Sequence, residues 1–285
     1  MADVTVRGVR FNVVRMGEGA PRTVLVHGLV MDSHASYYLS IAPALAARGG
    51  VLLYDLRGHG RSEQPATGYT MDDMVDDLVA LLDATGADAP VVLVGNSWGG
   101  QIVMRAAAAH PQRVRALVLI DPQSGIPDFT KELTEILAVD PDERDRRAYE
   151  LFCRWLEENA ALRGGAADEA AQARRSATID DVLRHRKQRR SPGVRTAVGL
   201  ARDTSLIADL ARETPISDAQ IARIACPVLA VYGERSELRH DEARYRALLR
   251  DVTVVAVPGM GHTVLLEAPN ALRDAITGWL DRLPE

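Results

Sequence analysis

Apolar runs and segments with helical spacing alternate over the first 120 residues of the chain. Runs of β-branched and aliphatic residues predict buried strands at Thr23–Val26, Val51–Tyr54, Val91–Val94 and Val114–Ile120. Alternating apolar and polar residues predict an opening hairpin from Val4–Arg7 and Phe11–Arg15, with its turn at Arg7-Gly8-Val9. Apolar residues at helical intervals predict helices at Tyr37–Arg48, Met71–Ala84 and Trp98–His110. Strands that alternate with helices indicate a mostly parallel sheet with helices on both faces.

The pattern changes after Asp121-Pro122-Gln123-Ser124-Gly125. From about Ile126 to Ile216 the chain is rich in Arg, Ala and Glu, has helical periodicity and carries no convincing strand. Apolar strands return at Cys226–Gly233 and Val252–Val257, and an amphipathic helix is predicted from Thr263 to Leu280. We therefore expect a core made of residues 1–124 and 217–285, with a helical cap of residues 125–216 laid over the sheet.

The composition is that of an ordinary globular protein, with 47% hydrophobic and 26% charged residues. A net charge of −5 argues against wholesale attraction to nucleic acid. No apolar segment approaches the ~20 residues needed to cross a bilayer, and residues Met1–Arg7 contain no apolar signal-peptide segment. We therefore expect a cytoplasmic protein that binds neither membrane nor nucleic acid. Its two cysteines, Cys153 and Cys226, do not indicate a disulfide framework.

The most informative motif is Gly95-Asn96-Ser97-Trp98-Gly99-Gly100, directly behind the apolar run Val91–Val94. Gly-x-Ser-x-Gly after such a run indicates a strand that turns sharply into a helix, with the serine at the tip of the turn. The backbone there adopts a conformation that most residues avoid, and the hydroxyl is held in the open. Gly95 and Gly99 remove the Cβ atoms that would collide where strand and helix cross. The motif therefore predicts that Ser97 is a nucleophile.

A serine hydroxyl is a poor nucleophile at neutral pH and needs a base within hydrogen-bonding reach, oriented by a third group. His262 lies in the glycine-bracketed loop Pro258–His262, right after the last predicted strand. Ligands gather at the carboxyl ends of strands in such sheets. We therefore predict that His262 is the base, whereas His110 and His185 belong to helix surfaces.

Two carboxylates compete for the role of the acid that orients His262. After the strand that ends at Gly233, the third position holds Ser236, where many enzymes with this layout carry an aspartate. Glu237 lies one residue further with a longer side chain, and it is the preferred acid. Asp121, at the end of the strand before it, is the alternative acid because it can face the same cavity. Weaker candidates are Glu234 and Asp241.

The oxyanion that develops during acyl transfer needs two backbone N–H donors held in place beforehand. One is predicted at Trp98, which follows the nucleophile at the N-terminus of its helix. The other is predicted at Leu29, in the loop after His27-Gly28, where Gly28 lets the backbone turn inward. The side chains of Leu29 and Trp98 are then expected to affect substrate fit.

Four segments together resemble the α/β-hydrolase superfamily: Val26–Gly28, Asp55–Ser62, Gly95–Gly100 and Gly259–His262. The resemblance covers nearly all of the chain outside the predicted cap. It implies an α/β fold with an eight-stranded, mostly parallel sheet flanked by helices, and a helical cap inserted between strands six and seven. It also implies that Asp55 and His59 are scaffold residues. A Gly-Glu-x-Ser-acid segment like that at 233–237 resembles a variant found in some members, which favours Glu237.

Serine as the nucleophile disfavours the dehalogenases and epoxide hydrolases of this family, which carry aspartate instead. The expected function is that of a serine hydrolase acting on an ester, thioester or lactone, such as a thioesterase or tailoring hydrolase of small-molecule metabolism. Gly-Asn-Ser-x-Gly-Gly also occurs in carbon–carbon bond hydrolases of the family, so that alternative stays open. So do receptor-like binding of a small molecule without turnover and a cofactor-free peroxidase activity. The sequence has no metal cluster, Walker loop or dinucleotide fingerprint, so no cofactor or metal is implied.

The residues that meet the substrate are expected to form an apolar acyl pocket. Candidates to line it are Val30, Met31, Tyr37, Tyr38, Phe129, Leu133 and Trp155. The predicted cap also carries the basic run Arg184–Arg190, with five positive charges in seven residues. A solvated helix face explains such a run most simply, and a docking patch for an acidic carrier protein is the sharper hypothesis.

Overall fold

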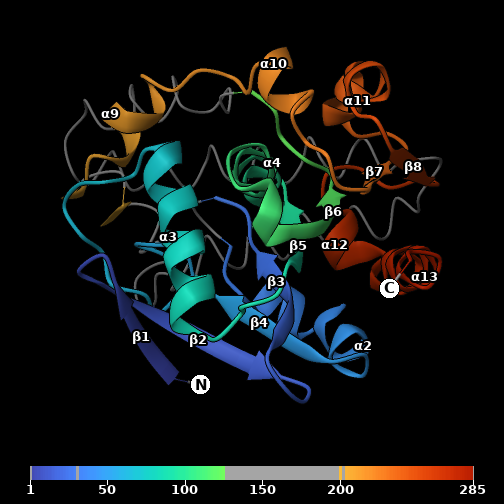
Figure 1. The fold of residues 1–285 in the computed structure, drawn as a ribbon. Helices are drawn as coiled ribbons and strands as arrows, with labels where there is room; N and C mark the ends of the chain where they lie inside the picture. Colours follow the sequence, from blue (N-terminus) through green and yellow to red (C-terminus); the bar gives the residue numbers. More distant parts are fainter. Residues whose placement is uncertain (1, 30–31, 126–198, 201–202, 285) are drawn as a thin grey trace, which may run out of the picture.

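A computed structural model describes residues 2–29, 32–125, 199–200 and 203–284. Its centre is an eight-stranded sheet in the order β1-β2-β4-β3-β5-β6-β7-β8 (Figure 1). The strands β1 and β2 pair antiparallel, as do β2 and β4, and all later pairs are parallel. The strand bounds are Ala2–Val6, Val9–Met16, Pro21–Val26, Gly50–Tyr54, Val91–Asn96, Val114–Ile120, Val228–Gly233 and Val252–Val257 for β1 to β8. The predicted fold class is confirmed.

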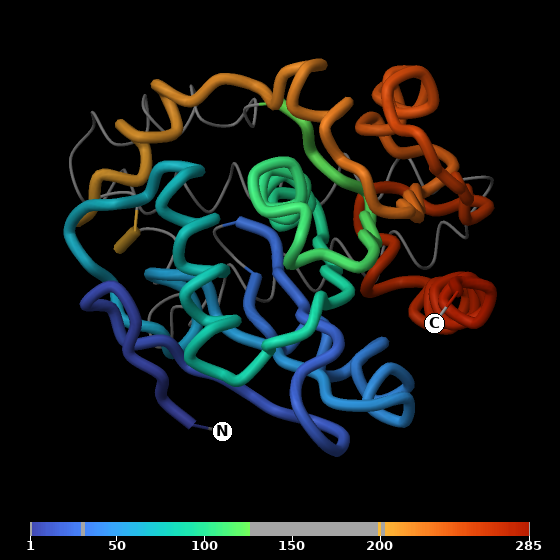
Figure 2. The backbone as a smooth tube through the Cα atoms, in the orientation of Figure 1, coloured from blue at the N-terminus to red at the C-terminus, as the bar shows by residue number. Residues whose placement is uncertain are grey.

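Helices cover both faces of the sheet, and the strands alternate their side chains between two hydrophobic cores. On one face lie α3 (Met71–Ala84), α4 (Trp98–Ala109), α9 (Leu206–Leu210), α10 (Asp218–Ile221) and α11 (Glu242–Leu248). On the other lie α1 (Ala35–Tyr38), α2 (Ala42–Ala46), α12 (Val264–Glu267) and α13 (Pro269–Leu280). Two 3₁₀ turns, η1 (Pro111–Arg113) and η3 (Glu237–Asp241), follow α4 and β7. Figure 2 shows the chain starting at the hairpin edge and ending beside α13.

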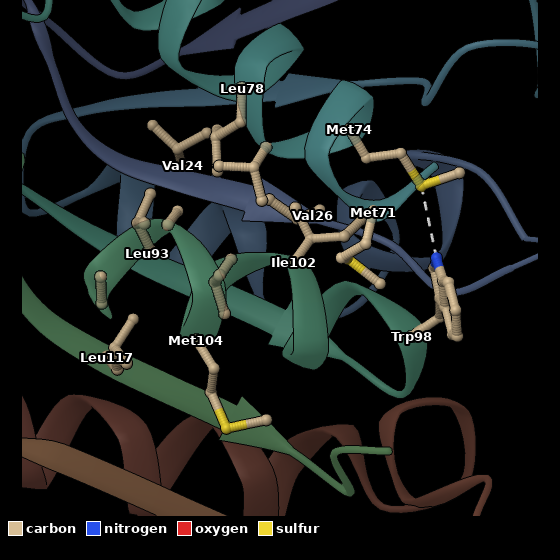
Figure 3. Close-up of a cluster of buried hydrophobic side chains, with 14 of the residues drawn as sticks. Val24, Val26, Met71, Met74, Leu78, Leu93, Trp98, Ile102, Met104 and Leu117 are labelled. Atoms are coloured by element: carbon tan, nitrogen blue, oxygen red, sulfur yellow. Dashed lines mark hydrogen bonds between the residues drawn. The ribbon is translucent and has the colours of Figure 1, made fainter. Parts of the chain in front are cut away.

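The buried strands β3, β5 and β6 explain why this sheet needs a helix layer on each face. Val24 and Val26 pack into the core under α3 and α4, while Leu25 between them packs into the opposite core. Figure 3 shows part of the first core, in which Leu78, Ile102 and the β3 valines lie together. Because neither face of these strands meets water, their sequences are continuous apolar runs and do not alternate.

Two predicted helices are each broken into two in the structure. The predicted helix Tyr37–Arg48 is divided between α1 and α2, and Pro43 lies in the first turn of α2. The predicted helix Thr263–Leu280 is divided between α12 and α13, and α13 begins at Pro269. Proline has no N–H to donate to the preceding turn and disfavours helical geometry in the residue before it. Both predictions of one continuous helix were therefore wrong, because each crossed a proline. Proline is favoured in the first turn of a helix and disfavoured in its interior.

The predicted cap, residues 125–216, lies mostly outside the described residues, so the cap and its boundaries stay a prediction. The described end of this segment packs on the core: Leu200, Leu206, Leu210 and Ile216 are buried in the same cluster as α3 and α4. In the part of the chain that the structure describes, no helix has the length and apolarity needed to cross a bilayer. Cys226 is a half-buried free thiol, and Cys153 lies outside the described residues.

Candidate active site

Ser97 lies at the sharp turn between β5 and α4, in a strained backbone conformation. Its φ of 51° and ψ of −117° lie in a region that costs a non-glycine residue about 1–3 kcal/mol. Three backbone hydrogen bonds hold the turn: Ser97 N–H donates to Ile120 O (3.0 Å), and Ser97 O accepts from Gly100 N–H (2.9 Å) and Gln123 N–H (3.1 Å). The strain is therefore supported by β6 and by the first turn of α4, and the serine is fixed in place.

The glycines around Ser97 allow strand and helix to cross at very short range. A Cβ atom on Gly95 would lie 2.4 Å from Gly99 O, and one on Gly99 would lie 2.1 Å from Val26 O. Both distances are far below van der Waals contact, and the atoms met are backbone, which cannot move aside without shifting the strand or the turn. The sequence prediction that these two glycines remove colliding Cβ atoms is confirmed.

His262 meets Ser97 from a loop 165 residues further along the chain. The loop follows β8 and precedes α12, and it places His262 Nε2 3.0 Å from Ser97 Oγ. The imidazole is largely buried, with 13% of the side chain exposed. The structure therefore brings the predicted nucleophile and the predicted base into hydrogen-bonding contact.

Asp121 is the carboxylate that meets His262. Its Oδ2 lies 2.5 Å from His262 Nδ1, and the residue is fully buried at the end of β6. Two further donors reach the same carboxylate: Gly233 N–H bonds Oδ1 (3.1 Å) and the Ser236 hydroxyl bonds Oδ2 (2.6 Å). A buried charge needs such partners, because an unpaired one would be strongly disfavoured away from water. These hydrogen bonds fix the direction of the carboxylate.

The preference for Glu237 over Asp121 is corrected by this geometry. Glu237 is exposed at the first residue of η3, and the imidazole nitrogen that it was expected to orient faces Asp121. The reason is the strand order: β6 lies between β5, which carries Ser97, and β7, which precedes Glu237. A carboxylate at the end of β6 is thus one strand nearer to the nucleophile. The order of the strands in the sheet is set by the tertiary structure. Along the chain, the signal for Asp121 was that a polar residue directly follows a buried apolar run.

The other two acid candidates have different partners. Glu234 is exposed and its carboxylate accepts a hydrogen bond from Gly259 N–H (2.9 Å). Asp241 is buried and is hydrogen-bonded to the Ser124 hydroxyl. Neither carboxylate is the one that meets the imidazole.

The charge around His262 favours its protonated form. Burial of the imidazole acts to lower its pKa, but the hydrogen bond to Asp121 and the negative charges of Asp121, Glu237 and Asp32 outweigh it, so the pKa of His262 is raised above its ordinary value. Before any proton transfer, Nδ1–H donates to Asp121 and Nε2 accepts from Ser97, which assigns the tautomer from the hydrogen-bond partners. The site can therefore accept a proton from the serine and stabilise the resulting cation.

The loop that carries Leu29 is held against the nucleophile by hydrogen bonds on both sides of Gly28. Gly28 O accepts from His27 Nδ1 (2.6 Å), and Gly28 N–H donates to Asp32 Oδ2 (2.8 Å). His27 is itself fixed, because its Nε2 accepts from Leu56 N–H (2.9 Å). A peptide bond is planar and trans, so fixing the Gly28 carbonyl also fixes the direction of the Leu29 N–H. A Cβ atom on Gly28 would lie 3.5 Å from Ser97 Cβ, which places this loop beside the nucleophile.

Trp98 contributes a backbone N–H and a buried ring. It is the first residue of α4, where the N–H has no partner within the helix and the helix dipole favours negative charge. Trp98 is 1% exposed, and its indole Nε1–H donates to Met74 Sδ (3.3 Å). Figure 3 draws this hydrogen bond as a dashed line. The ring packs in the core, and the expected effect of the Trp98 side chain on substrate fit stays a prediction.

The turn after β4 forms a rigid support next to this loop. Asp55 is buried and accepts hydrogen bonds from Asn12 Nδ2 (2.8 Å), Arg61 N–H (2.9 Å) and both the backbone N–H (2.9 Å) and Nδ1 (2.7 Å) of His34. Burial alone would raise the pKa of Asp55, but these donors hold it well below its ordinary value. His59 is fully buried, and its Nδ1 lies 2.8 Å from Arg57 O. Both residues thus brace the backbone next to the loop that carries Leu29.

The predicted substrate-lining residues have mixed positions. Tyr37 is fully buried, packs in the core under α1 and donates its hydroxyl to Val26 O (3.0 Å), so its prediction as a lining residue is wrong. Tyr38 is 45% exposed on α1, and its role stays a prediction. Outside the described residues lie Val30, Met31, Phe129, Leu133, Trp155 and the basic run Arg184–Arg190. Within the described ranges, no group of three His, Cys, Asp or Glu residues is placed to hold a metal ion.

Comparison with known proteins identifies the family of this chain. The family model described as alpha/beta hydrolase fold matches residues 21–269. The chain is 32% identical over 283 residues to a 2-(acetamidomethylene)succinate hydrolase of Mesorhizobium japonicum, covering 98% of this chain and 94% of that protein.

Two solved structures share the fold along nearly the whole chain. One, titled Est816 as an N-acyl homoserine lactone degrading enzyme, has a TM-score of 0.63 at 25% identity and covers 98% of this chain and 100% of that one. The other, a thermophilic esterase from Thermogutta terrifontis, has a TM-score of 0.74 at 22% identity and covers 99% of both chains. The match to the family model and the full-length relative together show that this chain belongs to the alpha/beta hydrolase family.

Proposed function

We propose that the protein is a serine hydrolase that cleaves an ester, thioester or lactone through a covalent acyl-serine intermediate. The observation that carries the proposal is the continuous chain of hydrogen bonds from Ser97 Oγ through His262 to Asp121. This arrangement has the three roles that activate a serine: a nucleophile, a base in contact with it, and a buried carboxylate that orients the base.

In the proposed reaction Ser97 Oγ attacks the acyl carbon while its proton passes to His262 Nε2. Asp121 stays ionised and stabilises the imidazolium. The negative charge on the former carbonyl oxygen is met by the N–H groups of Leu29 and Trp98, a contribution of about 2.7–4 kcal/mol per donor in comparable sites. His262 then returns the proton to the leaving group. Water, activated by the same imidazole, releases the acid product and restores Ser97.

The choice of substrate class rests on the nucleophile and on one relative. A serine supports acyl transfer, and the 25%-identical structure described as an N-acyl homoserine lactone degrading enzyme supports a lactone or related ester. The proposed acidic carrier protein would deliver a thioester to the basic run Arg184–Arg190. Cleavage of a carbon–carbon bond next to a carbonyl by the same three residues is the alternative chemistry.

The test combines a covalent probe with a substrate series. A fluorophosphonate probe should label the wild type and not Ser97→Ala, and kcat for p-nitrophenyl esters, thioesters or lactones should fall by about 10³-fold or more in that variant. Circular dichroism of Ser97→Ala serves as the control for folding. A wild type that binds a small molecule but resists the probe would point to a receptor. Labelling without turnover of any acyl substrate would point to carbon–carbon bond cleavage.

A further inference from the structure

Ser236 occupies the turn at which an acid was expected, and it contacts the acid that the structure uses. It is the third residue beyond Gly233 at the end of β7 and is 7% exposed. Its hydroxyl lies 2.6 Å from Asp121 Oδ2, the same oxygen that lies 2.5 Å from His262 Nδ1. Ser236, after β7, and His262, after β8, therefore contact the same oxygen of the Asp121 carboxylate.

Hydrogen bonds within the turn orient the Ser236 hydroxyl towards Asp121. Ser236 N–H donates to Gly233 O (3.0 Å), and Ser236 Oγ accepts from Leu238 N–H (3.2 Å) at the start of η3. The single hydroxyl proton is then available to Asp121. With Gly233 N–H on Oδ1, the carboxylate is bound on both oxygens from the β7 end and can rotate only by losing a buried hydrogen bond.

The end of β7 can come this close to the imidazole loop because residue 233 is glycine. A Cβ atom on Gly233 would lie 2.2 Å from Gly261 O, the carbonyl directly before His262. The turn that carries Ser236 is thus packed against the loop that carries the base.

We propose that Ser236, in the turn after β7, is a positioning residue whose hydroxyl holds the Asp121 carboxylate against His262. The inference rests on the proposed function, since it assigns a role within the same three-residue machinery.

The experiment compares Ser236→Ala with Ser236→Thr. Loss of a hydrogen bond to a charged group should lower kcat by roughly tenfold to a hundredfold in Ser236→Ala, with KM little changed. Ser236→Thr keeps the hydroxyl and should retain most of the activity. If both variants lose kcat equally, or if Ser236→Ala keeps the wild-type kcat, Ser236 does not position the acid.

The outcomes separate this inference from the proposed function. A wild type that neither reacts with a fluorophosphonate nor turns over acyl substrates contradicts the hydrolase itself. A wild type that does both, with a folded Ser236→Ala variant that keeps the wild-type kcat, contradicts only the positioning role of Ser236.

Discussion

At the scale of the residue, the site depends on two non-glycine residues held at positive φ. Ser97 and Asp121 have φ values of 51° and 43° and lie at the ends of the neighbouring strands β5 and β6. Each is fixed by the next strand: Ser97 N–H donates to Ile120 O, and Asp121 N–H donates to Val231 O (2.7 Å). Backbone hydrogen bonds to the neighbouring strand therefore stabilise the strained conformation of both residues. Both side chains contact His262.

The acid can be identified by comparing two neutral substitutions. Asp121→Asn should lower kcat by about 10⁴-fold, because an amide cannot stabilise the imidazolium and favours the wrong tautomer of His262. Glu237→Gln should change kcat by less than about tenfold, because this exposed group acts on His262 by charge alone and solvent screens that charge. Steady-state kinetics of the two purified variants decide between them, and the reverse ranking would return the role to Glu237.

At the scale of the element, a buried ion pair joins the turn after β4 to α3. Arg57 Nε and Nη2 bond the two carboxylate oxygens of Asp77 at 2.6 and 2.7 Å, and both side chains are at most 5% exposed. Arg7, in the turn of the opening hairpin, donates to the same carboxylate at 2.8 Å. One carboxylate on α3 therefore connects the hairpin, the helix and the turn after β4.

Removing that carboxylate should be costly. Asp77→Ala leaves the Arg57 guanidinium buried and unpaired, and we expect it to lower the free energy of unfolding by about 3–5 kcal/mol. Asp76→Ala is the matched control. The Asp76 carboxylate is 57% exposed, and within the described part of the chain its one ion pair is with Arg7 at 3.2 Å. Its removal should lower the free energy of unfolding by less than about 1 kcal/mol. Urea unfolding followed by circular dichroism measures both, and equal costs would contradict the bridging role.

At the scale of the whole molecule, the buried imidazole of His59 makes stability depend on pH. Burial, with the nearby His27, lowers the pKa of His59 to about 4. An unfolded chain would protonate this histidine near its ordinary value of 6.5. Between these two values the unfolded state binds more protons than the folded state, so stability falls as the pH is lowered.

We therefore expect the melting temperature to fall as the pH is lowered from about 6.5 to about 4, with His59 as one cause. His59→Gln should lower stability at pH 7 and should reduce the loss between pH 6.5 and 4. Differential scanning calorimetry across this range measures the slope for both proteins. A variant with the same slope as the wild type would show that other groups control acid unfolding.

Much of the fold was predictable because its signals are local. Strand runs such as Val114–Ile120 and the helix Met71–Ala84 agree with the structure to the residue. The wrong helices are those in which apolar spacing continued across Pro43 and Pro269, so the local preference of proline outweighed periodicity. Tyr37 was predicted to line a pocket because aromatic residues occur both in cores and in binding sites, and only packing distinguishes the two.

The alternation of strand and helix, the elbow at Ser97 and the loop that carries His262 were all predictable from local sequence. Each of these features depends on the residue types within a few positions. Which carboxylate meets the imidazole follows only from the assembled sheet, because β6 lies between β5 and β7. Glu237 and Asp121 are both plausible along the chain, but just one of them lies against His262 Nδ1 once the strands are in order.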